Sequence, residues 1–274
     1  MWRRARNVEN AYRKALYSLV ELFDQIAHSS GSDQNLYTRR MDEFQNSEEY
    51  NTFLLSVVRR MVTPLAVNNE RTWREAARKA TKGRVLYKAL MEELGKGTQT
   101  IIDNQIMENV NLIKTLPHDV AEKVVKDIYE NSLKGKRAKS IEQIIIGQTS
   151  KHARASARLI ARTEVSKTTT ALTKARSEQL DLHWYVWRTA LDGDRVRRSH
   201  RNMEGVLVNW NEPPSPEALV GEKNVGYYHA GNIWNCRCYP EPIVDIDDIP
   251  QNPKVYTQGK IERMSKAKFI KEFM

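Results

Sequence analysis

The stretch His183-Trp-Tyr-Val-Trp-Arg-Thr-Ala190 marks the point where the periodicity of this 274-residue chain changes. It is rich in aromatic and β-branched residues and alternates along its length, which is typical of a strand. Before it, apolar residues recur at helical spacing, and after it, short apolar runs alternate with proline- and glycine-rich turns. The pattern predicts an α+β protein, with a mostly helical N-terminal part and a small mixed C-terminal domain.

The residues before this stretch predict a series of helices. A break is expected at Ser29–Asp33, Pro64 is expected to follow the second helix, and Pro117 fits the first turn of a later one. The capping-box spacing of Ser140-Ile-Glu-Gln143 indicates a further short helix, and a long basic helix follows it. The predicted helices cover residues 8–26, 41–61, 69–93, 98–115, 117–133, 141–147 and 151–182.

Two further strands are expected after Ala190. Gly205–Val208 is a short apolar run, and Arg237–Val244 contains two prolines that limit it to an edge or bulged position. The residues between them, 209–234, are predicted to form a long loop, and loops of this length are usually functional or held by other contacts.

The last eighteen residues are predicted to form a basic amphipathic helix, with Ile261, Met264, Ala267, Ile270 and Phe273 on one face. That face would dock on the rest of the chain, on a partner or on a membrane surface. The predicted organisation is a helical region over 1–116, a connecting region with the long helix over 117–182, a mixed core over 183–250 and the terminal helix over 251–274.

The charge of the chain indicates a polyanionic neighbour. The net charge is +10, and residues 131–180 alone carry eleven Lys and Arg residues against three Glu, a local net charge of +8. A solvated helix face would have the same composition, so a DNA-binding surface is one of two interpretations. The predicted DNA-binding residues are Lys134, Lys136, Arg137, Lys139, Lys151, Arg154, Arg158 and Arg162.

Bulk features exclude some classes of protein. No apolar run is long enough to span a bilayer, so no membrane partner is expected, and no apolar segment follows the basic N-terminus as in a secretory signal. Two cysteines, Cys236 and Cys238, are too few for a disulfide framework, which fits synthesis in a reducing cytoplasm.

Four residues form a candidate metal site: His200, His229, Cys236 and Cys238. Imidazole and thiolate are the ligands that zinc prefers, and a metal would hold the long loop against a small sheet. The Cys-x-Cys spacing is tighter than that of a standard zinc finger. The alternative is that both cysteines are small buried apolar residues of the last strand and that His200 bonds a backbone carbonyl.

A second cluster contains Asp192, Arg195 and Arg197. On an extended segment Arg195 and Arg197 would face the same side, and Asp192 would pair with one of them. This arrangement is either an anion site or an internal ion pair that shapes the turn after the strand.

Catalytic arrangements are poorly supported. Ser199 and His200 are adjacent, and neighbours on a strand point to opposite faces, so they make poor partners in a catalytic triad. Cys236 with a histidine could form a thiolate pair, but the sequence supplies no third orienting group. A phosphate-binding glycine loop is absent as well.

The densest part of the chain resembles the phage Mu F-like family of minor head, or head morphogenesis, proteins. The resemblance rests on Trp187, Thr189-Ala190, Asp192, Val196-Arg197, Ser199-His200, Gly205 and Asn235-Cys-Arg-Cys238. It extends upstream through Leu159–Glu164 and Ala171–Arg176 to about Leu112, and it ends near Val244.

The resemblance implies a structural function in the virion. The expected protein is made in the bacterial host cytoplasm, joins the capsid at low copy number near the portal, and contacts packaged double-stranded DNA. Its expected protein partners are the portal protein and the major capsid or scaffold protein. The alternatives are an ADP-ribosyltransferase-like or other nucleotide-directed enzyme, and a non-specific DNA-binding protein.

Overall fold

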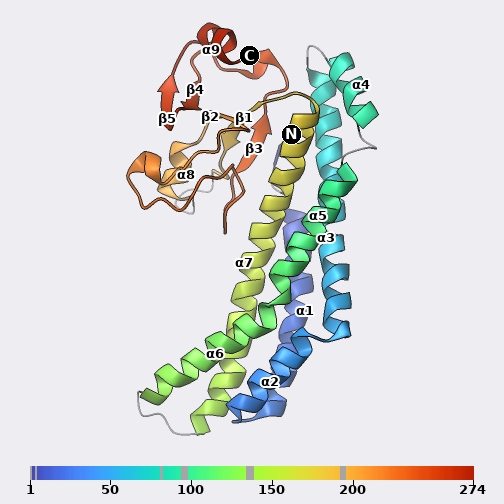
Figure 1. Cartoon of the computed structure of the whole chain (residues 1–274), viewed down its shortest axis with the longest axis vertical. Helices are drawn as coiled ribbons and strands as arrows, with labels where there is room; N and C mark the ends of the chain where they lie inside the picture. The colour runs from blue at the N-terminus through green and yellow to red at the C-terminus, as the bar shows by residue number, and fades with distance from the viewer. Residues whose placement is uncertain (1, 4, 81–82, 94–97, 134–138, 192–195) are drawn as a thin grey trace. The chain divides into compact units, whose positions relative to one another are not determined.

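The chain folds into two compact units, each assembled from segments that are distant in the sequence (Figure 1). The computed structural model describes residues 2–3, 5–80, 83–93, 98–133, 139–191 and 196–274. The helical unit comprises Arg6–Thr63 and Asn104–Glu164, and the mixed unit comprises Met1–Ala5, Pro64–Asp103 and Val165–Met274.

Helices make up most of the chain up to residue 179, as the apolar spacing predicts. Their bounds are α1 Arg6–Ser30, α2 Gln34–Gln45, α3 Glu48–Lys79, α4 Gly83–Glu93, α5 Thr98–Lys114, α6 Leu116–Leu133 and α7 Lys139–Gln179. The predicted break at Ser29–Asp33 is confirmed, because α1 ends at Ser30 and the side chain of Asp33 accepts a hydrogen bond from the backbone N–H of Leu36 at the start of α2.

The core of the helical unit joins α1 to the later helices. Leu16 and Phe23 of α1 are fully buried, and α2 packs along α6. Buried tyrosines add two polar links: the Tyr37 hydroxyl lies 2.8 Å from Thr149 Oγ1, and the Tyr50 hydroxyl donates to the carbonyl of Ile113 at 2.7 Å. Each pairing satisfies a hydroxyl that would otherwise be buried alone.

The prediction that Pro64 follows a helix is wrong, because α3 continues through it. An internal proline removes one helical hydrogen bond and costs about 3 kcal/mol. The apolar face of α3 offsets that cost, since it stays buried on both sides of Pro64, from Leu54 and Met61 to Leu65 and Trp73.

The two helices predicted over 141–147 and 151–182 are one helix, α7. Gly147 lies inside it at a cost of about 1 kcal/mol relative to alanine. Ile145 and Thr149 are fully buried on either side of Gly147, so packing holds the turn. The helix ends where Asp181 takes a positive φ of 57° and the N–H of Leu182 bonds the carbonyl of Ser177 at 2.8 Å, a Schellman-type end.

A five-stranded sheet forms the centre of the C-terminal part, in the order β3-β1-β2-β4-β5. The strands are β1 Trp184–Arg188, β2 Val206–Asn209, β3 Tyr239–Pro242, β4 Lys254–Thr257 and β5 Lys260–Arg263. β2 and β4 pair in parallel and the other pairs are antiparallel. The proline-containing β3 lies at an edge, as predicted.

The alternation of β1 divides the sheet into two apolar faces. Tyr185 and Trp187 point to one face, where they pack with Val206, Val208 and Tyr228. Trp184 and Val186 point to the other, where they pack with Phe269 of the terminal helix. The first face carries the candidate site, and the second is covered by α9, Lys266–Phe273.

The prediction of one helix over the last eighteen residues is wrong. Residues 254–263 form the β4–β5 hairpin, and only Lys266–Phe273 is helical. The hairpin turn has Gln258 at φ 50° and Gly259 at φ 77°, which is the conformation that a two-residue primed turn requires. The apolar face of α9 docks on the sheet of its own unit, since Phe269 packs edge-on against Trp184 at 5.0 Å. Within the described residues, no helix combines the length and the apolar character that crossing a bilayer requires.

Candidate metal centre

His200 lies on a short helix and not on the extended segment that its neighbours predict. The helix α8, Arg198–Asn202, follows Arg197 and turns both Ser199 and His200 into the interior, where they are 0% and 2% exposed. Ser199 and His200 therefore do not point to opposite faces as neighbours on a strand would, because adjacent residues of a helix differ by about 100° in direction. The ring of His200 packs edge-on against Trp187 of β1.

Cys236 and Cys238 lie in the segment that leads into β3 and not within the strand itself. Asn235 has a φ of 56°, and the kink there precedes Cys236. The backbone N–H of Cys238 points at the sulfur of Cys236, with an N···Sγ distance of 3.4 Å. The kink and this contact turn both thiols towards the core, where each residue is 2% exposed.

The same segment approaches α7 closely at Gly231, which has a φ of 86°. A Cβ atom there would stand 2.6 Å from Thr170 Oγ1 and 3.0 Å from the carbonyl oxygen of Cys238. Next to it, the Thr170 hydroxyl donates a hydrogen bond of 2.7 Å to the carbonyl of Ala230. The backbone before the cysteines is thus fastened to α7 of the mixed unit.

Three of the four predicted ligand residues meet in space. Nδ1 of His200 lies 3.5 Å from Sγ of Cys236 and 3.4 Å from Sγ of Cys238, and all three ligand atoms lie within 4.8 Å of one another. No further His, Cys, Asp or Glu joins this group in the part of the chain that the structure describes.

The opposite nitrogen of His200 is held by a buried relay. Nε2 lies 3.0 Å from the hydroxyl oxygen of Tyr228, and that hydroxyl donates to the carboxylate of Glu217 at 2.6 and 2.7 Å. Ser199 also contacts Glu217, at 3.2 Å. Glu217 is 6% exposed, so its carboxylate depends on these contacts. No sequence pattern marked Glu217 or Tyr228 as part of this site.

The two thiols differ in acidity. A hydrogen bond from the thiol of Cys238 lowers the pKa of Cys236, which His200 lowers further against the effect of burial. The same hydrogen bond, together with burial, raises the pKa of Cys238.

His229, the fourth predicted ligand, lies outside the group of three. Its Nδ1 is 3.2 Å from the hydroxyl of Tyr185, and its ring packs edge-on against Trp210. Burial, with a smaller contribution from Lys174, lowers the pKa of His229 from 6.5 to about 4. His229 is thus a neutral core residue at physiological pH.

The burial of His229 predicts a loss of stability in mild acid. The unfolded chain takes up a proton near pH 6.5, whereas the folded chain does so only near pH 4. The unfolded state therefore binds more protons within this window, and the free energy of unfolding should fall by about 2 kcal/mol between pH 7 and pH 5. Urea unfolding at the two pH values measures this.

The variant His229→Gln separates this effect from other titrations, since it should lose the His229 contribution to the pH dependence. His183→Gln is the control, because the side chain of His183 is 54% exposed. If wild type and His229→Gln lose stability in parallel as the pH falls, the assignment of the effect to His229 is wrong.

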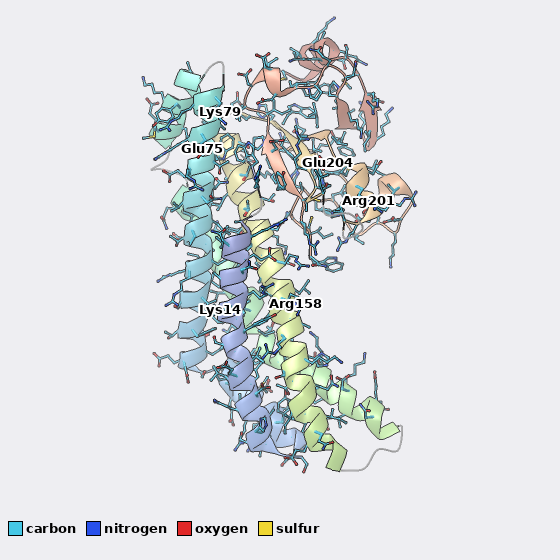
Figure 2. The ribbon with its side chains drawn as sticks, turned by 180° about the vertical axis from the view of Figure 1, so that it is seen from behind. Lys14, Glu75, Lys79, Arg158, Arg201 and Glu204 are labelled. Carbon is cyan, nitrogen blue, oxygen red and sulfur yellow. The ribbon has the colours of Figure 1, made fainter. Side chains whose placement is uncertain are left out.

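Of the predicted ion-pair cluster, Asp192 and Arg195 lie outside the described residues. Arg197 donates to the backbone carbonyl of Trp234 at 3.0 Å. A different ion-pair network stabilises the end of β1: Arg188 pairs with Glu204 and Glu241, and Glu204 also accepts hydrogen bonds from the N–H and the hydroxyl of Thr189. Glu204 and the neighbouring Arg201 are labelled in Figure 2.

The indoles of the long loop differ in their environments. Trp210 is buried in the core, at 2% exposed, whereas Trp234 is 59% exposed. An interface role that needs an accessible ring therefore applies to Trp234 and not to Trp210.

The predicted DNA-binding residues of α7 form a stripe in the helical unit. Lys151, Arg154 and Arg158 are exposed and, with Arg162, follow the three- and four-residue spacing of one helix face. Arg154 also lies over the ring of Tyr17, and Arg162 pairs with Glu9 at 3.6 Å. Lys134, Lys136 and Arg137 lie outside the described residues, and the side chain of Lys139 is not described.

Comparison with known proteins finds a similarity to one family over the part of the chain that holds the buried site. Residues 122–240 match the model of a family described as "Phage Mu protein F like protein". This span runs from α6 to β3 and includes His200, Glu217, Tyr228, Cys236 and Cys238.

One relative is described as an uncharacterized protein of Haemophilus influenzae. It is 30% identical over 159 residues, which are 57% of this chain and 32% of the relative. The chain therefore spans about a third of the length of this relative. No solved structure matches the chain significantly. Residues 122–240, which hold the buried histidine and cysteines, are therefore similar to the phage Mu protein F-like family.

Proposed function

We propose that this protein is a structural component of phage head morphogenesis. The observation that carries the proposal is the family match over residues 122–240, because these residues contain the whole buried site. The protein would be a minor head protein, incorporated near the portal during capsid assembly.

A deletion in the encoding phage tests this proposal. Without the gene, we expect the major capsid protein to accumulate while the yield of infectious particles falls, and a copy of the gene supplied in trans should restore the yield. Normal infectious particles in the deletion strain would contradict the proposal.

The burial of the site supports a structural function over a catalytic one. His200, Cys236 and Cys238 are each 2% exposed, whereas a nucleophile or general base must reach its substrate. The first alternative, an ADP-ribosyltransferase-like enzyme, would need an accessible cleft at this face. Turnover of a nicotinamide dinucleotide by the purified chain would favour that alternative.

We further propose that the stripe of Lys151, Arg154 and Arg158 contacts DNA phosphates. Their spacing on α7 presents three charges along one exposed line of the helical unit, and Lys14 of α1 lies on the same visible face (Figure 2). Such a surface binds through counterion release and not through base contacts, so binding would be non-specific and sensitive to salt.

Neutralising this stripe should weaken DNA binding. The triple variant Lys151→Gln, Arg154→Gln, Arg158→Gln should reduce the slope of log affinity against log salt concentration by about 2 to 3, because each phosphate contact contributes about 0.9. Fluorescence anisotropy with a double-stranded DNA of arbitrary sequence, measured over a salt series, gives the slope.

A second triple variant provides a control with the same change in charge. Arg59, Arg60 and Lys114 are exposed residues of the helical unit on α3 and α5. Their replacement by glutamine should change the slope less than the α7 variant does. Equal slopes for the two variants, or no binding by the wild type at low salt, would contradict the proposed surface.

We also propose that this protein contacts the portal, major capsid or scaffold protein during head assembly. A groove of about 1340 Å³ in the helical unit lies along α2 and α6 and is lined in part by Val125 and Tyr129. Tyr129 is 65% exposed, which is typical of an aromatic residue at a contact surface. We place the partner contact at this groove. Crosslinking from this position to a head protein in assembling particles would support it, and crosslinks solely from elsewhere on the chain would contradict it.

A further inference from the structure

Two of the spacings among three buried side chains match the edges of a tetrahedral metal site. With Zn–S bonds of about 2.3 Å and a Zn–N bond of about 2.05 Å, a sulfur and a nitrogen ligand stand about 3.6 Å apart. The two S···N distances here, from His200 Nδ1 to Cys236 and to Cys238, are 3.5 and 3.4 Å. An ion could thus be bound with little movement of the three side chains.

The relay behind His200 directs the correct nitrogen at the sulfurs. Because the Tyr228 hydroxyl donates its proton to Glu217, its oxygen can accept the Nε2–H of His200. The Nδ1 lone pair then faces Cys236 and Cys238, which is the tautomer that a metal requires. A carboxylate behind a ligating histidine is a common arrangement in zinc sites.

The charge of the pocket also favours a cation. Two thiols and the carboxylate of Glu217 are buried together, at 2% and 6% exposed. Among the described residues, the ion pair of Glu217 at this site is with His200, at 3.7 Å, and that imidazole is charged only when protonated. A divalent ion would balance two thiolates, whose negative charges would otherwise be expensive to bury.

The geometry points to a zinc site: we propose that Cys236, Cys238 and Nδ1 of His200 bind one zinc ion. Tyr228 and Glu217 position His200 for this. His229 is not a ligand. Thiolate and imidazole together select zinc over magnesium or calcium. The ion would connect α8 to the segment before β3, and so fasten the long loop to the first face of the sheet. Binding would release the protons that the thiols still carry.

Metal analysis of the full chain, purified without chelator, tests the proposal first. We expect about one zinc per chain by elemental mass spectrometry, because the three side chains converge on a single position. After zinc removal, titration with Co²⁺ should give the intense visible bands of tetrahedral cobalt and a thiolate-to-cobalt charge-transfer band. Folded wild-type protein that holds neither metal would overturn the proposal, and circular dichroism checks the fold.

Variants identify the ligands. Cys236→Ser and Cys238→Ser should each weaken the charge-transfer band, and His200→Gln should shift the visible bands while the sulfur signal remains. His229→Gln and the exposed control His183→Gln should keep one zinc and an unchanged cobalt spectrum. Loss of the metal in folded His229→Gln, or its retention in a Cys236→Ser, Cys238→Ser double variant, would overturn the assignment.

Glu217→Gln tests the positioning of His200. It should keep the cobalt spectrum and lower the affinity for zinc by roughly 10- to 100-fold, the usual effect of removing such a partner. Zinc competition with a chromophoric chelator measures the affinity. An unchanged affinity in a folded Glu217→Gln variant would remove Glu217 from the site, and the ligand variants test the three ligands independently.

Discussion

Replacing Gly231 by alanine is expected to destabilise the mixed unit by between about 2 and 5 kcal/mol. The residue has a φ of 86°, which side chains with a Cβ rarely adopt, and the new methyl group would meet Thr170, Ser166 and the backbone of Cys238 at 3.0 Å or less. The carbonyl of Cys238 belongs to the backbone and cannot rotate away, so the backbone around Gly231 must move. Chemical denaturation measures the loss.

Gly221→Ala is the matched control for this variant. Gly221 has a similar φ of 73°, but a Cβ there would meet no atom within 4 Å. Gly221→Ala should therefore lose only the stability that corresponds to the backbone strain, about 1 to 2 kcal/mol. If the two variants lose the same stability, the close approach of Gly231 to α7 contributes nothing and the packing described for this segment is wrong.

Truncation of Phe269 to alanine should cost about 3 to 5 kcal/mol, the usual range for a buried phenylalanine. Phe269 is 0% exposed and packs edge-on against Trp184 at 5.0 Å, so it anchors α9 to the second face of the sheet. We also expect faster amide hydrogen exchange over residues 266–273, because the helix loses its main apolar contact. Denaturation and exchange mass spectrometry give the two readouts.

Lys271→Ala serves as the control on the same helix. Lys271 is exposed, and a surface substitution of this kind usually changes stability by less than about 0.5 kcal/mol. A loss below about 1 kcal/mol in Phe269→Ala would mean that α9 does not depend on this contact, and docking of its apolar face on a partner would then be favoured.

Strong local periodicity explains which elements could be predicted. β1 was predictable because its alternating aromatic residues are buried on both faces of the sheet, and α1 because one face carries most of its apolar residues. The two-residue turn at Gln258-Gly259 was missed because Ile261 and Met264, which follow it, share a helical spacing with the apolar residues of α9. Turn geometry, and not hydrophobic pattern, decided that segment.

Tertiary packing overrode the local signals at Pro64 and Gly147. Each residue favours a break, yet buried neighbours on both sides hold α3 and α7 continuous. The energy of that packing comes from residues distant in the sequence, so no local rule could have predicted it.

Three residues of the candidate site could be predicted from the sequence, and their surroundings could not. His200, Cys236 and Cys238 stood out because histidines and cysteines are rare in this chain, and the fold brings them together. His229 shares that chemistry but lies beside Tyr185, outside the group. Glu217 and Tyr228 sit in the long loop among other polar residues, and only the folded loop places them behind His200.

The proposal that this protein is part of the phage head can be tested directly by measuring its copy number in particles. Quantitative mass spectrometry of purified procapsids and DNA-filled heads, with the major capsid protein as the internal standard, gives its copy number. The account predicts a few copies per particle in at least one of these stages. A chain that is abundant in the infected-cell lysate but absent from both kinds of particle would contradict it.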